Sequence, residues 1–154
     1  IKGLEKNSPA RFIIDKYLNI PLNSRIVKTS TKYRTFLFFN KFNKKKINEL
    51  KNSNVKLINT SLNFNGEFDL ADILYQIKKL GFSRILIESG LNMTSKFLKQ
   101  ELIDDFYIFI SGKKLGINGN NSFLNNYNYY LKKKKKLKEK INLFEDELYL
   151  YRIK

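Results

Sequence analysis

The turn Glu88-Ser89-Gly90 places a carboxylate, a hydroxyl and a glycine between an apolar run, 84–87, and a segment with helical periodicity, 92–101. In open α/β sheets, ligands bind at such junctions at the carboxyl ends of strands. Backbone N–H groups and the positive end of the helix dipole favour a phosphate there, and Gly90 would let it approach closely. The alternative is an ordinary strand-to-helix turn that binds nothing. Glu88 favours a ligand somewhat, because a carboxylate at a strand end needs water, a lysine or a ligand as its partner.

The chain contains no Cys and no His. Thiolate nucleophiles, disulfides, zinc fingers and Ser-His-Asp triads are therefore excluded. Any chemistry must use carboxylates, lysines, hydroxyls, backbone groups or a cofactor. We expect no metal site, and the residues alone identify no catalytic group.

Net charge gives only weak information about partners. The 154 residues include 30 Lys and Arg and 14 Asp and Glu, which give a net charge of +16. Taken alone, this charge suggests nucleic acid, an anionic membrane or a phosphorylated small molecule as the binding partner. The abundance of Lys, Asn, Ile, Phe and Tyr, however, is typical of an AT-rich genome. No apolar run approaches the ~20 residues of a membrane span, so we expect a cytoplasmic protein without a membrane partner. Because Ile1 replaces the usual Met, we expect the C-terminal part of a longer protein.

Strands and helices are expected to alternate along most of the chain. The expected strands are 11–15, 34–39, 55–58, 84–87 and 106–110, and the expected helices are 44–52, 69–81 and 92–101. Continuous apolar character in the first two strands favours a mostly parallel sheet with both faces covered. Helix 69–81 places apolar residues at three- and four-residue spacing, with Asp69 in its first turn and Gly81 at its end. The elements from 84 to 110 predict a βαβ unit with a right-handed crossover.

The C-terminal part has a different pattern. Gly112, Gly116 and Gly119 predict a long loop, and the Tyr/Asn-rich stretch up to Tyr130 resists assignment. The lysines of 131–140 predict a solvated turn or a helix fragment. Residues 143–144 and 148–151 predict a closing antiparallel hairpin around 145–147.

Several segments resemble one known family. The run Arg-Ile-Leu-Ile-Glu-Ser-Gly from Arg84 leads through Leu-Ile-Asp-Asp to a strand ending at Ser111, followed by Lys114-Leu115-Gly116. The segment Ser-Pro-Ala-Arg-Phe-Ile-Ile-Asp, 8–15, precedes Ile-Pro-Leu-Asn-Ser, 20–24, and 146–152 is similar to the family's last strand. These motifs resemble the reductase domain of the bifunctional riboflavin-biosynthesis deaminase/reductase.

The resemblance implies a dihydrofolate-reductase-like α/β fold, with a mostly parallel sheet flanked by helices and a C-terminal antiparallel hairpin. Residues 1–154 would form a single domain, the C-terminal portion of a pyrimidine reductase domain that lacks its N-terminal strand and motifs. The implied reaction is NADPH-dependent reduction of 5-amino-6-(5-phosphoribosylamino)uracil, a phosphorylated pyrimidine, to its ribitylamino form. The family also implies a homodimer formed through a sheet edge.

By position, Glu88 matches the family's substrate-contacting glutamate. The residues that match the NADPH-binding positions are Lys16, Gly90, Leu91, Asn92, Met93, Thr94, Ser95 and Lys96. Two of the matched positions depart from the family: Ser89-Gly90 stands where Gly-Gly is usual, and Lys16, which follows Asp15, replaces a small polar residue. Lys16 would pair with a phosphate or point to water.

Two other functions remain open. One is a basic nucleic-acid-binding domain, in which aromatics stack on bases while lysines hold phosphates; its candidate residues are Tyr127, Tyr129, Tyr130, Lys132 to Lys136, Lys138 and Lys140. Against it, lysine runs are usually solvated surface, and no RNA-binding motif accompanies this one. The other is a non-catalytic remnant of the reductase.

Overall fold

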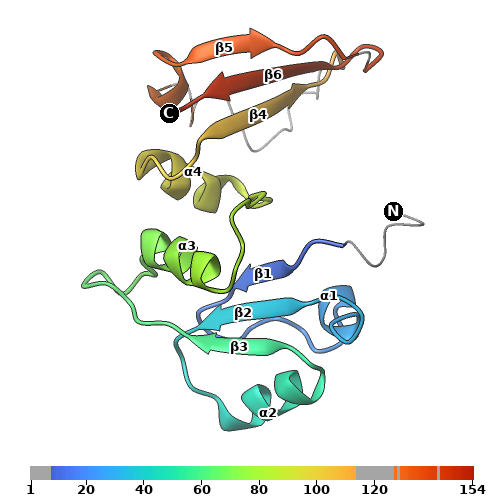
Figure 1. Cartoon of the computed structure of the whole chain (residues 1–154), viewed down its shortest axis with the longest axis vertical. Helices are drawn as coiled ribbons and strands as arrows, with labels where there is room; N and C mark the ends of the chain where they lie inside the picture. Colours follow the sequence, from blue (N-terminus) through green and yellow to red (C-terminus); the bar gives the residue numbers. More distant parts are fainter. Residues whose placement is uncertain (1–7, 114–126, 128, 142) are drawn as a thin grey trace. The chain divides into compact units, whose positions relative to one another are not determined.

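The computed structural model describes residues 8–113, 127, 129–141 and 143–154 (Figure 1). The chain divides into two compact units, Ile1–Gly81 and Phe82–Lys154. A single domain over 1–154 stays a prediction. The predicted loop glycines Gly116 and Gly119 lie outside the described residues.

A three-stranded parallel sheet forms the centre of the first unit. Its order is β1 (Arg11–Ile14), β2 (Thr35–Phe39) and β3 (Lys56–Asn59). All five residues of β2 are buried, because this strand is paired on both sides and covered on both faces. Phe12 stacks on Phe36 with ring centroids 4.9 Å apart, whereas Leu37 points into the core on the opposite face. The parallel sheet predicted from the apolar runs is therefore confirmed.

Two short helices complete this core, α1 (Arg25–Lys28) and α2 (Lys44–Asn52). Helix α2 has the predicted bounds, and Asn43 caps its start by accepting a hydrogen bond from the Lys46 N–H at 3.0 Å. The buried core cluster consists of Leu18, Val27, Leu37, Phe39, Ile47, Leu50 and Val55.

Helix α3 (Leu70–Lys79) confirms the predicted helix 69–81 but is shorter, because Asp69 is its N-cap and Leu80 its C-cap. The Asp69 carboxylate accepts hydrogen bonds from the Ala71 and Asp72 N–H groups at 2.9 and 3.2 Å. Gly81 follows the helix with φ +90°, the left-handed conformation that favours glycine. Leu80, the last apolar residue of the predicted helix, is 43% exposed, because it lies beyond the last helical residue.

The second unit contains α4 (Leu91–Lys99), β4 (Asp105–Ile110), β5 (Lys135–Lys138) and β6 (Glu147–Arg152). Its sheet has the order β4-β6-β5, and both pairings are antiparallel. Helix α4 follows the prediction closely, with Phe97 and Leu98 buried.

The predicted strand 84–87 was wrong. Residues 82–90 have no regular structure, and Leu86 is 80% exposed. Apolar character favours a strand only where a neighbouring strand takes its hydrogen bonds, and none of the described strands pairs with this segment. The predicted βαβ unit and its crossover are therefore also wrong, since β4 pairs with β6 in antiparallel orientation.

The C-terminal antiparallel hairpin is confirmed, but its first strand is β5 and not 143–144. Phe144 lies in the connection and is 99% exposed. The lysine run forms a turn at 132–133 and then an edge strand, where the prediction had only a turn or helix fragment. Because β5 is exposed and rich in lysine, its sequence lacks the apolar alternation that predicts a strand. Lysines are nevertheless common on edge strands, where they prevent pairing with other chains. The Lys136 ammonium lies over the Tyr149 ring of β6, 3.7 Å from its centroid.

Candidate functional site

The start of α4 is built around Gly90, which is the N-cap residue with φ −67° and ψ 168°. No side chain caps this end, and the first turn contains no acidic residue. The first N–H groups of a helix have no partner within the helix. Gly90 has no side chain that could bond to those of α4, and a ligand at this turn stays a prediction.

Two hydroxyl groups brace this turn. The Thr94 hydroxyl donates to the Ser89 carbonyl at 3.2 Å, and the Ser89 Oγ lies 2.9 Å from the Thr94 Oγ1. Since Thr94 uses its proton on the carbonyl, Ser89 donates in the second bond. Ser89, which departs from the family's glycine, thus helps to hold the turn.

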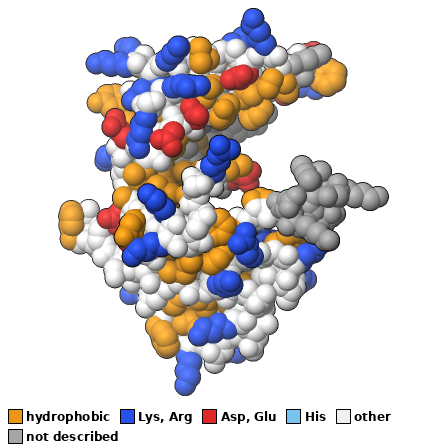
Figure 2. Space-filling model, in the orientation of Figure 1, with side chains coloured by type: hydrophobic (Ala, Val, Ile, Leu, Met, Phe, Trp, Pro, Cys, Tyr) orange, Lys and Arg blue, Asp and Glu red, His pale blue; other side chains and the backbone are white. Residues whose placement is uncertain are grey.

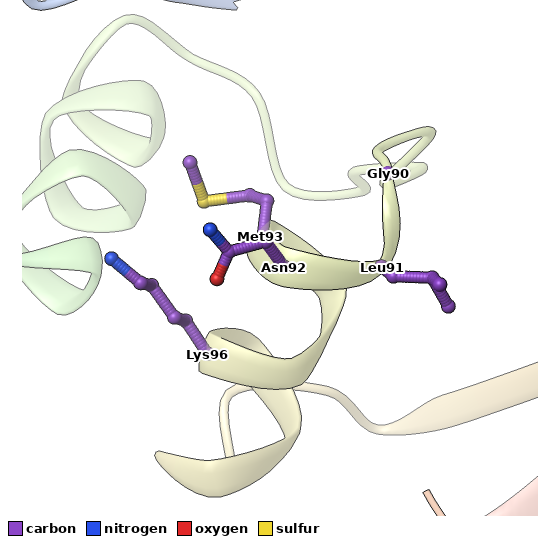
Figure 3. A pocket seen from close by; sticks show the side chains of 5 residues that line it. All are labelled: Gly90, Leu91, Asn92, Met93 and Lys96. Atoms are coloured by element: carbon purple, nitrogen blue, oxygen red, sulfur yellow. The ribbon is translucent and has the colours of Figure 1, made fainter. Parts of the chain in front are cut away.

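An open hollow of about 330 Å³ lies at the start of α4 (Figure 3). It is lined by Gly90, Leu91, Asn92, Met93 and Lys96. Asn92, Met93 and Lys96 project to one side of the helix, whereas Leu91 projects to the other (Figure 3). The hollow thus combines a helix start without a side-chain cap with a lysine from the last turn of the same helix, and the two together suit an anionic group.

The Leu91 carbonyl accepts two side-chain hydrogen bonds. The Ser95 hydroxyl donates to it at 2.8 Å and the Tyr127 hydroxyl at 2.7 Å. The Tyr127 side chain is only 1% exposed, and its ring meets Phe106 edge-on with centroids 5.9 Å apart. Tyr127, one of the three tyrosines of the nucleic-acid hypothesis, is therefore too buried to stack on a base. The sequence carried no signal for its contact with Leu91 across 36 residues.

Glu88, the predicted substrate contact, is exposed to solvent in the segment before Gly90. No regular element holds this part of the chain, because the predicted strand 84–87 is absent. The carboxylate is thus accessible to a ligand.

Lys16, the remaining predicted cofactor residue, belongs to the first unit and follows β1. Its ammonium donates to the Gly66 carbonyl at 2.5 Å and lies over the Tyr17 ring, 5.0 Å from the centroid. Asp15 beside it accepts a hydrogen bond from the Ile20 N–H at 2.7 Å. The Lys16 ammonium therefore already has partners within the protein and does not simply point to water.

The carboxyl edge of the parallel sheet contains polar residues that the sequence analysis missed. The Asn40 side-chain amide, just after β2, donates to the carbonyl of Thr60, which follows β3, at 3.0 Å. The backbone N–H of Asn40 and that of Lys41 donate to the Lys16 carbonyl at 3.2 and 2.9 Å. A polar residue directly after each apolar run was the signal that could have identified this edge.

Arg11, the arginine of the Pro-x-Arg motif, is used by the fold. Its guanidinium donates to the hydroxyls of Thr29 and Thr35 at 2.7 and 2.5 Å and to the Tyr33 carbonyl at 3.3 Å. Burial lowers the pKa of Arg11 from its ordinary value, against the opposing effect of Tyr33. The motif thus ties β1 to the start of β2.

The lysines of the nucleic-acid hypothesis lie largely on β5 and the turn before it. Lys138 forms an ion pair with Glu147, which also accepts the Tyr149 hydroxyl at 2.6 Å. The hydrogen bond to Glu147 raises the pKa of Lys138, and the same bond lowers the pKa of Glu147. On the face seen in Figure 2, Lys and Arg side chains are scattered over the surface instead of forming one patch.

These features define the class: an α/β protein with a parallel and an antiparallel sheet and a candidate anion-binding site at a helix start. No helix in the described part of the chain is long and apolar enough to cross a membrane. Among the described residues, no cluster of acidic side chains could hold a metal ion.

A family model, the RibD C-terminal domain, matches residues 2–141, and the chain belongs to this family. The riboflavin biosynthesis protein RibD of Aquifex aeolicus is 28% identical over 111 residues, which cover 72% of this chain and 29% of that protein. The protein of the same name from Chlamydia trachomatis is 28% identical over 116 residues, 75% of this chain and 30% of that protein. The chain thus spans less than a third of these relatives' length.

A solved structure, Acinetobacter baumannii RibD, form 1, shares the fold. Its TM-score is 0.66 at 19% sequence identity, covering 94% of this chain and 37% of that chain. The predicted fold class is confirmed by this match, and the predicted family by the family model.

Proposed function

We propose that this chain is the reductase part of an enzyme of riboflavin biosynthesis, which reduces 5-amino-6-(5-phosphoribosylamino)uracil with NADPH. The observation that carries the proposal is the uncapped, glycine-started helix α4 with its hollow, in a chain of the RibD C-terminal domain family. The relatives from Aquifex aeolicus and Chlamydia trachomatis are riboflavin biosynthesis proteins, which supports the pathway.

The residues at the start of α4 fit the pyrophosphate of a dinucleotide. The N–H groups after Gly90 would donate to phosphate oxygens, and Lys96 would supply positive charge. The volume of about 330 Å³ is at the lower end for ligand pockets, which suits part of a dinucleotide rather than the whole. When bound, NADPH supplies the hydride; the chain's own residues bind, orient and exclude water.

Lys16 is also proposed to bind the cofactor. Its ammonium would exchange the Gly66 carbonyl for a phosphate oxygen, a stronger partner because it is charged. Until then the hydrogen bond to Gly66 keeps the side chain in place.

Glu88 is proposed to bind substrate. An exposed carboxylate is an acceptor for the N–H and O–H groups of an aminopyrimidine bearing a ribosyl chain. We expect Glu88→Gln, in the complete protein, to impair use of the substrate more than NADPH affinity, since the amide keeps the size but loses the charge. Steady-state kinetics with each substrate varied in turn measure this, and an unchanged rate with the pyrimidine would remove Glu88 from the site.

The oligomeric state and the location of the protein complete the proposal. We propose a homodimer formed through a sheet edge and a cytoplasmic location, both on the basis of family membership. Light scattering of the purified chain tests the dimer.

The experiment that tests the function is a calorimetric titration of NADPH into the purified chain at low and high salt. Saturable binding at both salts supports the cofactor site, and oxidation of NADPH on adding the pyrimidine to the complete protein supports the reaction. A remnant would bind without turnover. Binding that RNA shares and that salt abolishes steeply would favour the nucleic-acid function instead.

A further inference from the structure

Tyr127 is a large aromatic side chain whose ring is buried and whose hydroxyl has a defined partner. Only 1% of it is exposed, and its hydroxyl donates to the Leu91 carbonyl at 2.7 Å. Leu91 is the first residue of α4 and lines the hollow. A contact from a distant segment therefore reaches the candidate site at its first helical residue.

The start of α4 has no capping side chain, and beyond the Ser89 and Thr94 hydroxyls it is held by this anchor. A glycine N-cap has no side chain with which to bond the first turn, and helices with an unsatisfied start fray there. A capping side chain would fix the turn but would also occupy the N–H groups needed by an anion. Tyr127 bonds instead to a carbonyl, so it fixes the same turn and leaves its N–H groups open.

The anchor is itself held in place. The Tyr127 ring packs edge-on against Phe106 of β4, with centroids 5.9 Å apart. Phe106 is opposite Tyr151 in the antiparallel sheet, so the support comes from a paired strand rather than from a loop. A rigid support of this kind is what a precisely oriented binding turn requires.

We propose that Tyr127 is a positioning residue for the cofactor site: its hydroxyl holds the first turn of α4 so that the N–H groups after Gly90 and the Lys96 ammonium are oriented for phosphate. The inference rests on the proposed function, because it assigns that site its phosphate ligand. Tyr127 acts through Leu91 and does not itself touch the cofactor.

The test compares Tyr127→Phe, which removes only the hydroxyl, with Tyr129→Phe, a matched control whose side chain is 85% exposed. Calorimetric titration of NADPH into the full chain gives the affinity. We expect Tyr127→Phe to bind about three- to tenfold more weakly, the loss typical of one hydrogen bond, and Tyr129→Phe to bind as the wild type does. Equal affinity for all three proteins would overturn the proposal.

Amide hydrogen exchange separates positioning from general loss of stability. The Thr94 N–H donates to the Gly90 carbonyl at 3.1 Å and closes the first turn of α4. At the other end of the helix, the Gln100 N–H donates to the Lys96 carbonyl at 3.1 Å. In Tyr127→Phe without ligand, we expect exchange of the Thr94 amide to rise about three- to tenfold and that of Gln100 to stay unchanged. Equal acceleration of both amides would mean that Tyr127 only stabilises the fold.

The two readouts distinguish this proposal from the proposed function. If the wild type binds no NADPH, the proposed function fails, and the Thr94 amide alone decides whether Tyr127 positions the turn. Phe106→Leu provides a second variant that keeps the hydroxyl but loosens its support. In Phe106→Leu we expect the Thr94 amide to exchange faster than in the wild type, but by less than in Tyr127→Phe. If the exchange rate of this amide is unchanged in both variants, the role of Tyr127 is refuted.

Discussion

Replacing Gly90 with aspartate should stabilise the fold and weaken cofactor binding at the same time. Gly90 has φ −67°, which any residue adopts, and a Cβ atom at this position would meet nothing within 4 Å. Aspartate is among the best N-cap residues, and replacing a glycine also lowers the entropy of the unfolded chain. Together these effects add about 0.5–1 kcal/mol to the free energy of unfolding, or about 1–4 °C in Tm.

The effect on binding has the opposite sign. A carboxylate about 4 Å from a phosphate costs about 1 kcal/mol at a dielectric constant of 80 and about 4 kcal/mol at 20. We therefore expect the affinity of Gly90→Asp for NADPH to fall at least about fivefold, and more at low salt than at high salt. Gly90→Asn has nearly the same shape and caps a helix equally well, but it adds no charge.

Thermal unfolding and calorimetric titration of the three proteins decide the matter. The expected order of NADPH affinity is wild type, then Gly90→Asn, then Gly90→Asp, whereas both variants should melt at or above the wild-type Tm. If Gly90→Asp binds NADPH as tightly as the wild type, no phosphate lies at the start of α4. A variant that instead melts well below the wild type would refute the statement that the fold does not need this glycine.

Two further predictions concern residues outside the hollow. Arg11→Met should lower the free energy of unfolding by about 2 kcal/mol in urea denaturation, because it removes hydrogen bonds to two threonine hydroxyls and a carbonyl; an unchanged midpoint would contradict that role. The pKa of Glu147 is lowered in the folded protein, chiefly by the hydrogen bond from Lys138. This ion pair therefore stabilises the folded state at pH values above the ordinary pKa of 4.5, and that stabilisation is lost as the pH falls through the lower pKa of the folded state. An NMR titration should show the Glu147 pKa rising in Lys138→Met, and no rise would exclude the ion pair in solution.

The fold could be predicted where the determining interactions are local or where burial is complete. Helix α3 has its own cap in Asp69 and its own terminator in Gly81, and β2 is apolar throughout because it is buried on both faces. The errors arose where pairing is decided at a distance. Segment 84–87 has the composition of a strand but no described partner, whereas β5 is rich in lysine and pairs with β6 nonetheless.

The candidate site could likewise be predicted only in part: its local residues could, but its contacts with distant segments could not. Five of the predicted residues, Gly90, Leu91, Asn92, Met93 and Lys96, line one hollow, whereas Thr94 and Ser95 do not line it and the apolar run before them forms no strand. The burial of Tyr127 was not predictable, because its partner Leu91 is 36 residues away and an aromatic beside lysines is equally typical of a surface. Lys16 directly follows the predicted strand 11–15, but its hydrogen bond to Gly66 could not be predicted because it depends on a turn 50 residues later.

The motif residues fall into two groups, and the difference bears on whether the chain still works as a reductase. Arg11 and Asp15 hold β1 and the turn after it through several hydrogen bonds, so a remnant would have to keep them merely to fold. Glu88 and Gly90 have no such role: Glu88 is exposed, and the position of Gly90 would accept a side chain. In a chain released from catalysis these two positions could change at little cost in stability. The stability of the fold does not explain these two residues, and we propose that a bound ligand does.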